Sequence, residues 1–427
     1  MKILLSTAII CMLLSHSIMA QSVAIRAGHV VDPATGQTHD NQIITIKDHK
    51  IVAVDRDLDV SRADQVIDLP NAWVLPGLMD AHVHLTLNVP ENLGRGVPFE
   101  TFYLTESNAF RALRGAKNAG ATLQAGFTTV KDIGNDGNYA VTDVKKAISA
   151  GWFEGPTIIN AGKIIAAFGG QSKGISPEQG LFWQYEYLDA DSPDEIRKAV
   201  RQNIYYGATA IKLVADNSAY YYSEDEIRAA VEEGHKAGLA VTVHVQGGEA
   251  ARNVILGGAD AIEHGFELDD ELLQLMKDKG TYLVGTDFPL SHLQAMGFFI
   301  DDPETLANAI IHRLRRANEI GVKMAFGTDI VVDLDGRTRG DLALDFLDVW
   351  EAAGVPAAKI LQCMTTNAAD LLRLENRGTI ATGQYADIIA VPENPLRNIH
   401  TLKNVQFVMK EGRIVKQAHG ASEMTRK

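Results

Sequence analysis

Histidines recur at the ends of apolar segments, and His82 and His84 have the closest spacing. They end the run Trp73-Val-Leu-Pro-Gly-Leu-Met-Asp-Ala-His82-Val-His84. In a strand, residues i and i+2 point to the same side, so one strand end can present both imidazoles together. Two convergent imidazoles are a compact way to hold a metal ion. The pair therefore indicates a metal site if other segments supply further ligands.

Four more polar residues lie at the expected carboxyl ends of other strands: Lys212, His244, His264 and Asp329. In a barrel of parallel strands these ends meet at one mouth, so we expect all six side chains to converge. Nitrogen and oxygen ligands in this number suit two divalent ions such as Zn²⁺. Two cations would repel a free ammonium, so we expect Lys212 to carry CO₂ as a carbamate that can bridge them.

Each of these residues also has a simpler interpretation. A histidine on an apolar strand can be a hydrogen-bonded core residue, and Lys212 can be half of an ion pair. Asp329 follows Gly327-Thr328 and can belong to a loop or cap a helix. The order of the set favours the metal, because a His-x-His pair is followed by a lysine, two histidines and an aspartate at expected strand ends.

Residues 76–373 alternate apolar runs with helical patterns. The expected strands cover residues 74–84, 128–132, 157–160, 210–214, 240–245, 261–264, 282–285 and 324–329. Helices are expected after the caps Ser192 and Ser223, and over residues 270–279, 303–320 and 357–374. Eight strands with room for a helix after each predict an α/β fold with a (β/α)₈ TIM-type barrel. A doubly wound open sheet is the alternative.

Both ends of the chain carry short strands separated by turns. Residues 21–75 contain turn signals at Asp32-Pro-Ala-Thr-Gly36 and at Asp48-His-Lys50, and residues 374–427 show similar patterns. We expect the two ends to pair as one small β-sandwich domain with the barrel inserted between them.

Charge and composition limit the partners. The formal net charge of −14 argues against nucleic acid and anionic membranes. After residue 20 no apolar run is long enough to span a bilayer. Residues 1–20 combine Lys2, an apolar core and Ala20, the pattern of a cleaved signal peptide, so we expect a secreted or periplasmic protein. Without this segment Cys363 has no cysteine to pair with in the chain.

These motifs resemble those of the amidohydrolase superfamily. The resemblance rests on Pro76-Gly-Leu-Met-Asp-Ala-His-Val-His84, Lys212, His244, Glu263-His-Gly265 and Gly327-Thr-Asp329, and it extends to residues 25–32, 366–372 and 378–389. It implies a distorted (β/α)₈ barrel, a flanking β-sandwich and a binuclear metal centre with a carboxylated Lys212. The stretch Ala125-Gly-Phe-Thr-Thr-Val-Lys-Asp132 is similar to the imidazolonepropionase-related group, which includes Xaa-Pro dipeptidases.

The resemblance also implies residues that contact the substrate. Relatives usually have Gly-Gly-His after the third strand, whereas this chain has Gly169-Gly-Gln171, and glutamine donates a hydrogen bond without a positive charge. Tyr222 aligns with a substrate-binding tyrosine, but it can equally be a packed aromatic at a helix start. In the implied mechanism a metal-bridging hydroxide attacks the carbonyl, and Asp329 passes its proton to the leaving amine. Gln171 and Tyr222 would donate hydrogen bonds to the tetrahedral oxyanion or to the substrate carboxylate.

The expected activity is metal-dependent hydrolysis of a carbon–nitrogen bond, as in an amidohydrolase or dipeptidase. The favoured substrate is a dipeptide, Xaa-Pro-like or with another C-terminal residue, or an N-acyl amino acid. Alternatives are a lactone, a cyclic amide or an aryl amide such as an ochratoxin-type N-acyl phenylalanine, and a non-catalytic binding protein. Arg337 and Arg339 can meet a substrate carboxylate, or pair with Asp333, Asp335 or Asp341. A homo-oligomer is expected.

Overall fold

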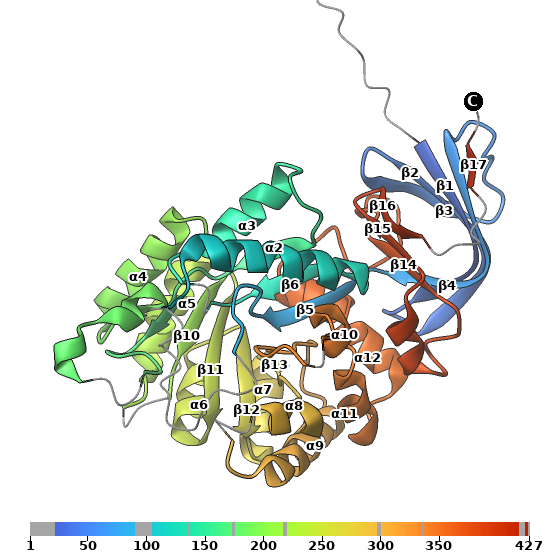
Figure 1. Ribbon diagram of the computed structural model, residues 1–427. Helices are drawn as coiled ribbons and strands as arrows, with labels where there is room; N and C mark the ends of the chain where they lie inside the picture. Colours follow the sequence, from blue (N-terminus) through green and yellow to red (C-terminus); the bar gives the residue numbers. More distant parts are fainter. Residues whose placement is uncertain are drawn as a thin grey trace, which may run out of the picture.

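A computed structural model describes residues 22–89, 105–134, 137–172, 176–216, 220–296, 300–334, 336–417 and 423–425. The expected signal peptide at residues 1–20 lies outside these residues. Figure 1 shows two parts: a sheet made from both ends of the chain, and a larger body in which helices surround a set of strands.

The elements follow one another as strands, then alternating strands and helices, then strands again. The strands are β1 (Ser22–Asp32), β2 (Gln37–Lys47), β3 (Lys50–Asp55), β4 (Gln65–Pro76), β5 (Leu78–Val83), β6 (Phe127–Asp132), β7 (Thr157–Asn160), β8 (Ile164–Ala166), β9 (Tyr187–Asp189), β10 (Ile211–Val214), β11 (Val241–Gly247), β12 (Ala261–Glu267), β13 (Tyr282–Val284), β14 (Ile388–Val391), β15 (Phe407–Lys410), β16 (Arg413–Gln417) and β17 (Glu423–Thr425). The α-helices are α2 (Asn108–Gln124), α3 (Ala140–Ser149), α4 (Pro193–Tyr205), α5 (Glu224–Lys236), α6 (Gly248–Leu256), α7 (Asp270–Lys279), α8 (Leu290–Ala295), α9 (Pro303–Ile320), α10 (Arg339–Ala343), α11 (Phe346–Ala352), α12 (Ala357–Cys363) and α13 (Thr366–Leu371). Short 3₁₀ helices are η2 (Pro177–Gln179), η3 (Phe182–Tyr185) and η4 (Ile399–Asn404).

The strands of the larger body pair in parallel, which confirms the α/β fold. One sheet has the order β5-β6-β7, and the other has the order β13-β12-β11-β10-β8-β9. Because the strands are parallel, their carboxyl ends lie at one edge, where the candidate ligands were expected.

Residues 323–329 lie between the two sheets and bond to both. The amide of Leu283 donates to the carbonyl of Lys323 at 2.8 Å, and the amide of Ala81 donates to the carbonyl of Phe326 at 2.7 Å. Within the described residues this segment makes only one β-bridge, to Leu283, so the expected eighth strand is an irregular segment there. A ring of eight strands stays an expectation.

Several helices begin as the sequence predicts. The hydroxyl of Ser223 accepts the amide of Glu226, whose carboxylate accepts the amide of Ser223 at 2.8 Å, so α5 has the expected capping box. Ser192 caps α4, with Pro193 at the first position. Helices α7 and α9 span the expected residues, whereas the helix expected at 357–374 is divided into α12 and α13.

The strand expected at residues 74–84 is in fact two strands in two sheets. Strand β4 ends at Pro76 and pairs with β1 and β14, while β5 begins at Leu78 and pairs with β6. Gly77 lies between them, and a Cβ at this position would lie 2.2 Å from Oγ1 of Thr128. The close approach that glycine permits therefore lets the chain pass from one sheet to the other.

Both ends of the chain contribute to one sheet, in which β17 pairs with β4 and the other strands have the order β16-β15-β14-β4-β1-β2-β3 (Figure 1). This terminal sheet has its own hydrophobic cluster, which includes Ile25, Ile44, Ile67, Ile388 and Phe407. Among the described residues no helix is long and apolar enough to cross a membrane.

Candidate metal centre

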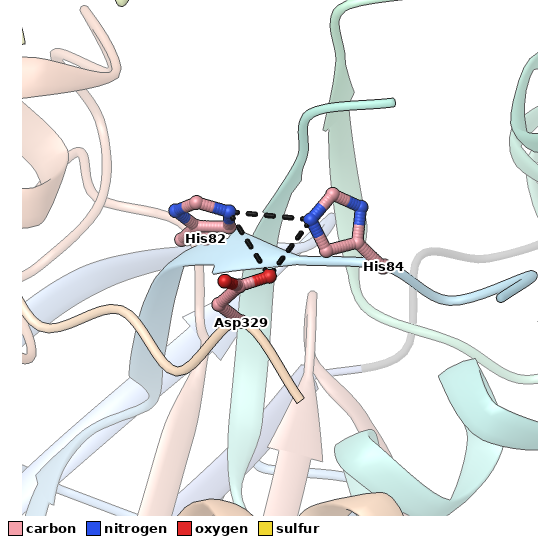
Figure 2. A group of neighbouring side chains, drawn as sticks. All are labelled: His82, His84 and Asp329. Atoms are coloured by element: carbon pink, nitrogen blue, oxygen red, sulfur yellow. Dashed lines mark hydrogen bonds and ion pairs between the residues drawn. The ribbon is translucent and has the colours of Figure 1, made fainter. Parts of the chain in front are cut away.

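Three candidate ligands meet at the carboxyl end of β5. Nε2 of His84 lies 2.9 Å from Oδ1 of Asp329, and Nε2 of His82 lies 3.4 Å from the same oxygen. The two Nε2 atoms are 3.2 Å apart, and Figure 2 shows both rings directed at the carboxylate. One potential ligand atom from each residue lies within 4.8 Å of the others. This donor set of two imidazoles and a carboxylate fits a divalent ion such as Zn²⁺.

The other two histidines continue this group. Nδ1 of His264 lies 3.8 Å from Oδ2 of Asp329, and the rings of His82 and His264 have centroids 5.1 Å apart. The ring of His244 lies 4.3 Å from that of His264. The parallel topology thus brings four expected histidine ligands and the carboxylate of Asp329 together. They come from the ends of β5, β11 and β12 and from the segment at residues 323–329.

Lys212 lies buried on β10, next to β11, which carries His244. Burial lowers the pKa of Lys212 to about 8, although the charges of Glu263 and Asp329 oppose this effect. A lysine with such a pKa has an appreciable neutral fraction near neutral pH, and the neutral amine is the form that reacts with CO₂.

Hydrogen bonds fix which nitrogen of each histidine faces Asp329. Nδ1 of His84 lies 2.7 Å from the carbonyl of Gly134, which can only accept, so this nitrogen carries the hydrogen. Nδ1 of His82 likewise donates to Oε2 of Glu263 at 2.7 Å. In the neutral rings the lone pair is then on Nε2, which faces the cluster, and this is the tautomer that a metal ligand requires.

Glu263 is fully buried and forms an ion pair with Lys131. The ammonium of Lys131 donates to Oε1 of Glu263 at 2.6 Å, and the hydroxyl of Thr242 donates to the same oxygen. Burial would raise the pKa of Glu263, but Lys131 and His82 outweigh it and hold this pKa well below its usual value. Glu263 is therefore an ionised acceptor that orients His82.

Asp80 joins the strand with the histidines to the segment with Asp329. Its Oδ1 accepts the amides of His82 and Thr328 at 3.0 and 3.1 Å, and its Oδ2 accepts the hydroxyl of Thr328 at 2.7 Å. The amide of Asp329 also donates to the carbonyl of His82 at 2.7 Å. Two ligand segments that are distant in sequence are thus held in register.

Three residues of the site have positive φ angles: His264 at 69°, Asp329 at 54° and Thr286 at 45°. This region is unfavourable for residues with a Cβ and especially for a β-branched one. Such strain persists only where the surrounding structure enforces it, and it is often found at functional sites.

Burial and neighbouring charges shift the pKa values of four side chains at the site. Burial lowers the pKa of His244 to about 3, and burial followed by His244 lowers that of His264 well below its usual value, so both rings are neutral. For Asp329, His82 and His84 outweigh burial and hold the pKa well below its usual value. For His84, burial is outweighed by Asp329, which raises the pKa.

Gln171 and Tyr222 both have partners within the protein. The hydroxyl of Tyr187 donates to Oε1 of Gln171 at 2.8 Å, which fixes the amide and leaves its donor group, Nε2, on the other side. Tyr222 is 1% exposed and donates to the carbonyl of Ala190 at 2.7 Å, which is the packed-aromatic interpretation. For each residue a role toward the substrate stays a prediction.

Both arginines are engaged with protein groups. Arg337 makes two bonds to the carboxylate of Asp345, at 2.7 and 2.9 Å. Arg339 is 6% exposed, pairs with Asp333 at 3.0 Å and donates to the carbonyl of Leu87 at 2.9 Å. Arg339 therefore connects the segment that follows His84 with the segment that follows Asp329. A contact with the substrate stays a prediction for both arginines.

Sequence reasoning did not identify the residues that support the ligands. These residues are Glu263, Lys131, Asp80, Thr286 and Asp216. Oδ1 of Asp216 lies 3.9 Å from Nε2 of His244. A signal existed for Lys131 and Glu263, because a charged residue inside an apolar strand is buried only with a partner. The identity of the partner depends on the pairing of strands.

Comparisons with known proteins agree with this geometry. The model of the Amidohydrolase family matches residues 73–415. The chain is 27% identical over 439 residues to ochratoxinase of Aspergillus niger, and this alignment covers 93% of this chain and 87% of that protein. It is 25% identical over 378 residues to the imidazolonepropionase of Caldanaerobacter subterraneus subsp. tengcongensis, and this alignment covers 82% of this chain and 84% of that protein.

A solved structure is also similar over nearly the whole chain. The crystal structure of a Xaa-Pro dipeptidase with bound methionine in the active site superposes with a TM-score of 0.81 and 30% identity, covering 92% of this chain and 99% of that one. The superfamily resemblance is therefore confirmed: the chain belongs to the Amidohydrolase family and is a hydrolase that acts on carbon–nitrogen bonds.

Proposed function

We propose that this protein is a binuclear metal-dependent amidase that cleaves the amide between an acyl group and an amino acid. The substrate would be a dipeptide or another N-acyl amino acid. The observation that carries the proposal is the convergence of His82, His84 and Asp329, with His264 beside them and Lys212 on the strand beyond. The names of the relatives support the substrate class, since one is a Xaa-Pro dipeptidase and another an ochratoxinase.

The residues that would hold two Zn²⁺ ions are His82, His84, His244, His264, Asp329 and a Lys212 that carries a carbamate. When bound, these ions would activate water and polarise the substrate carbonyl. The carboxylate of Asp329 is ionised and would accept a proton from water. Asp329 would then return this proton to the leaving amine, while Nε2 of Gln171 donates to the oxygen of the substrate.

Replacing Asp329 by asparagine tests this role. Asp329→Asn keeps the shape of the side chain but removes the proton acceptor, so we expect turnover to fall by at least about 100-fold. Hydrolysis is measured on a panel of dipeptides and N-acyl amino acids, with metal content determined on the same samples. Asp40→Asn in the terminal sheet is the matched control, because Asp40 is exposed and pairs with His29.

The panel also separates the competing substrate classes. Cleavage of dipeptides and N-acyl amino acids that chelation abolishes and Zn²⁺ restores would support the proposal. Turnover confined to lactones or cyclic amides would replace the substrate class, and full activity of Asp329→Asn would remove Asp329 from the mechanism. Binding of panel members without turnover would favour a non-catalytic protein.

A further inference from the structure

The loop that follows β13 is held by a buried ion pair. Arg313 of α9 and Asp287 of the loop have side chains that are 2% and 1% exposed, and Nη2 of Arg313 lies 3.1 Å from Oδ1 of Asp287. The same nitrogen donates to the carbonyl of Gly285 at 2.9 Å. Burying two charges is costly even when they are paired, so hydrophobic residues would fill this space at lower cost.

The backbone of the loop is fitted closely around this pair. A Cβ on Gly285 would lie 2.2 Å from Nη1 of Arg313 and 2.6 Å from Oδ1 of Asp287. The guanidinium of Arg313 also lies 5.9 Å from the centre of the Phe266 ring, two residues after His264 on β12. Arg313 therefore contacts both the loop and the strand that carries a candidate ligand.

Thr286 lies between Gly285 and Asp287 and contacts His264 directly. Its Oγ1 is 2.9 Å from Nδ1 of His264, and its φ angle is 45°. A β-branched residue rarely adopts this conformation, and it does so only where neighbouring contacts enforce it. Arg313 contacts the residues on either side of Thr286, through a hydrogen bond to Gly285 and an ion pair with Asp287, and is therefore placed to hold Thr286 in this conformation.

We propose that the Arg313–Asp287 pair is a positioning device for His264. It holds the loop so that the hydroxyl of Thr286 fixes the plane of the His264 imidazole next to Asp329. Arg313, Asp287 and Thr286 are thus positioning residues, and their effect passes through His264. This inference rests on the proposed function, in which His264 is a metal ligand.

Zn²⁺ affinity measured by chelator competition on the full-length chain tests the proposal without relying on turnover. We expect Thr286→Val, which removes the hydroxyl and keeps the shape, to weaken Zn²⁺ binding about 10- to 100-fold, and Asp287→Asn to do the same. Thr286→Ser keeps the hydroxyl and should bind Zn²⁺ as the wild type does. The double variant Thr286→Val/Asp287→Asn should be no weaker than the weaker single variant, because both changes act through one contact.

Asp387→Asn is the matched control, because Asp387 forms a buried ion pair with Lys410 in the terminal sheet, 3.1 Å apart. It should lower the melting temperature and leave Zn²⁺ affinity unchanged. If Asp287→Asn does not fold, Thr286→Val and Thr286→Ser still decide the question. Two outcomes would overturn the inference: wild-type Zn²⁺ affinity in Thr286→Val, or losses of Zn²⁺ affinity that add in the double variant. In either case, weak Zn²⁺ binding by His264→Ala would still uphold the proposed metal site. Wild-type affinity in His264→Ala would instead refute the proposed metal site, and this inference with it.

Discussion

At the scale of single residues, the convergence of the candidate ligands could be predicted, and most of their partners could not. The spacing of His82 and His84 and the strand ends at His244 and His264 are visible along the chain, because periodicity places side chains on one face. Glu263 orients His82 from a strand far away in sequence, and the ion pair with Lys131 depends on how β6 and β12 are placed in space. No local pattern encodes such a distance.

Removing the cation of this pair should reveal the cost of the charge that it leaves behind. Lys131→Met would leave the carboxylate of Glu263 buried without its ion-pair partner, so we expect the free energy of unfolding to fall by about 3–5 kcal/mol. In Lys131→Met/Glu263→Gln no unpaired charge remains, and most of this loss should be recovered. Urea denaturation measures both values. Equal losses in the single and double variants would show that the Lys131 chain acts by packing alone.

At the scale of elements, helices were more predictable than strands. Helices α5, α7 and α9 carry their own start signals and an apolar face, and they form where expected. The break between β4 and β5 could not be predicted, because it depends on how closely Thr128 approaches Gly77. The short strands β8 and β9 were missed for a different reason, because three residues carry almost no periodic signal.

The break at Gly77 can be tested by adding a methyl group. Gly77→Ala places a Cβ against the side chain of Thr128, so we expect a loss of about 1–3 kcal/mol in the free energy of unfolding and weaker Zn²⁺ binding at β5. Thr128→Ala in the same chain should relieve much of both effects. Gly120→Ala is the control, because it lies inside α2 with room for a Cβ and should stabilise by up to about 1 kcal/mol. Equal effects at both glycines would contradict this account.

At the scale of the whole molecule, the alternation of strands and helices predicted an α/β body, and the parallel pairing confirms it. The turn-rich ends were expected to form a sandwich, and the structure shows one sheet in which strands from both ends are neighbours. Composition could not predict how Arg377, Lys410, Asp387 and Glu411 would meet there, since their pairing requires the completed sheet.

This charged cluster should make stability depend on pH. Burial alone would raise the pKa of Glu411, but Lys410 and Arg377 outweigh it and lower this pKa to about 2 from 4.5. The stabilisation from ionised Glu411 is therefore complete above pH 4.5 and is lost as the pH falls toward 2. Glu411→Gln should melt at a lower temperature at pH 7, and its melting temperature should fall less between pH 5 and 2. An identical pH slope in wild type and variant would exclude this role for Glu411.

The position of β4 has a consequence for how the protein is made. Leu75 of β4 pairs with Ile389 of β14, so one edge of β4 finds its neighbour only after nearly the whole chain has left the ribosome. Synthesis of the roughly 300 intervening residues takes on the order of tens of seconds, during which the nascent chain presents an open strand edge next to the segment that becomes β5. The polypeptide therefore depends on its last strands to cover an edge of its first ones.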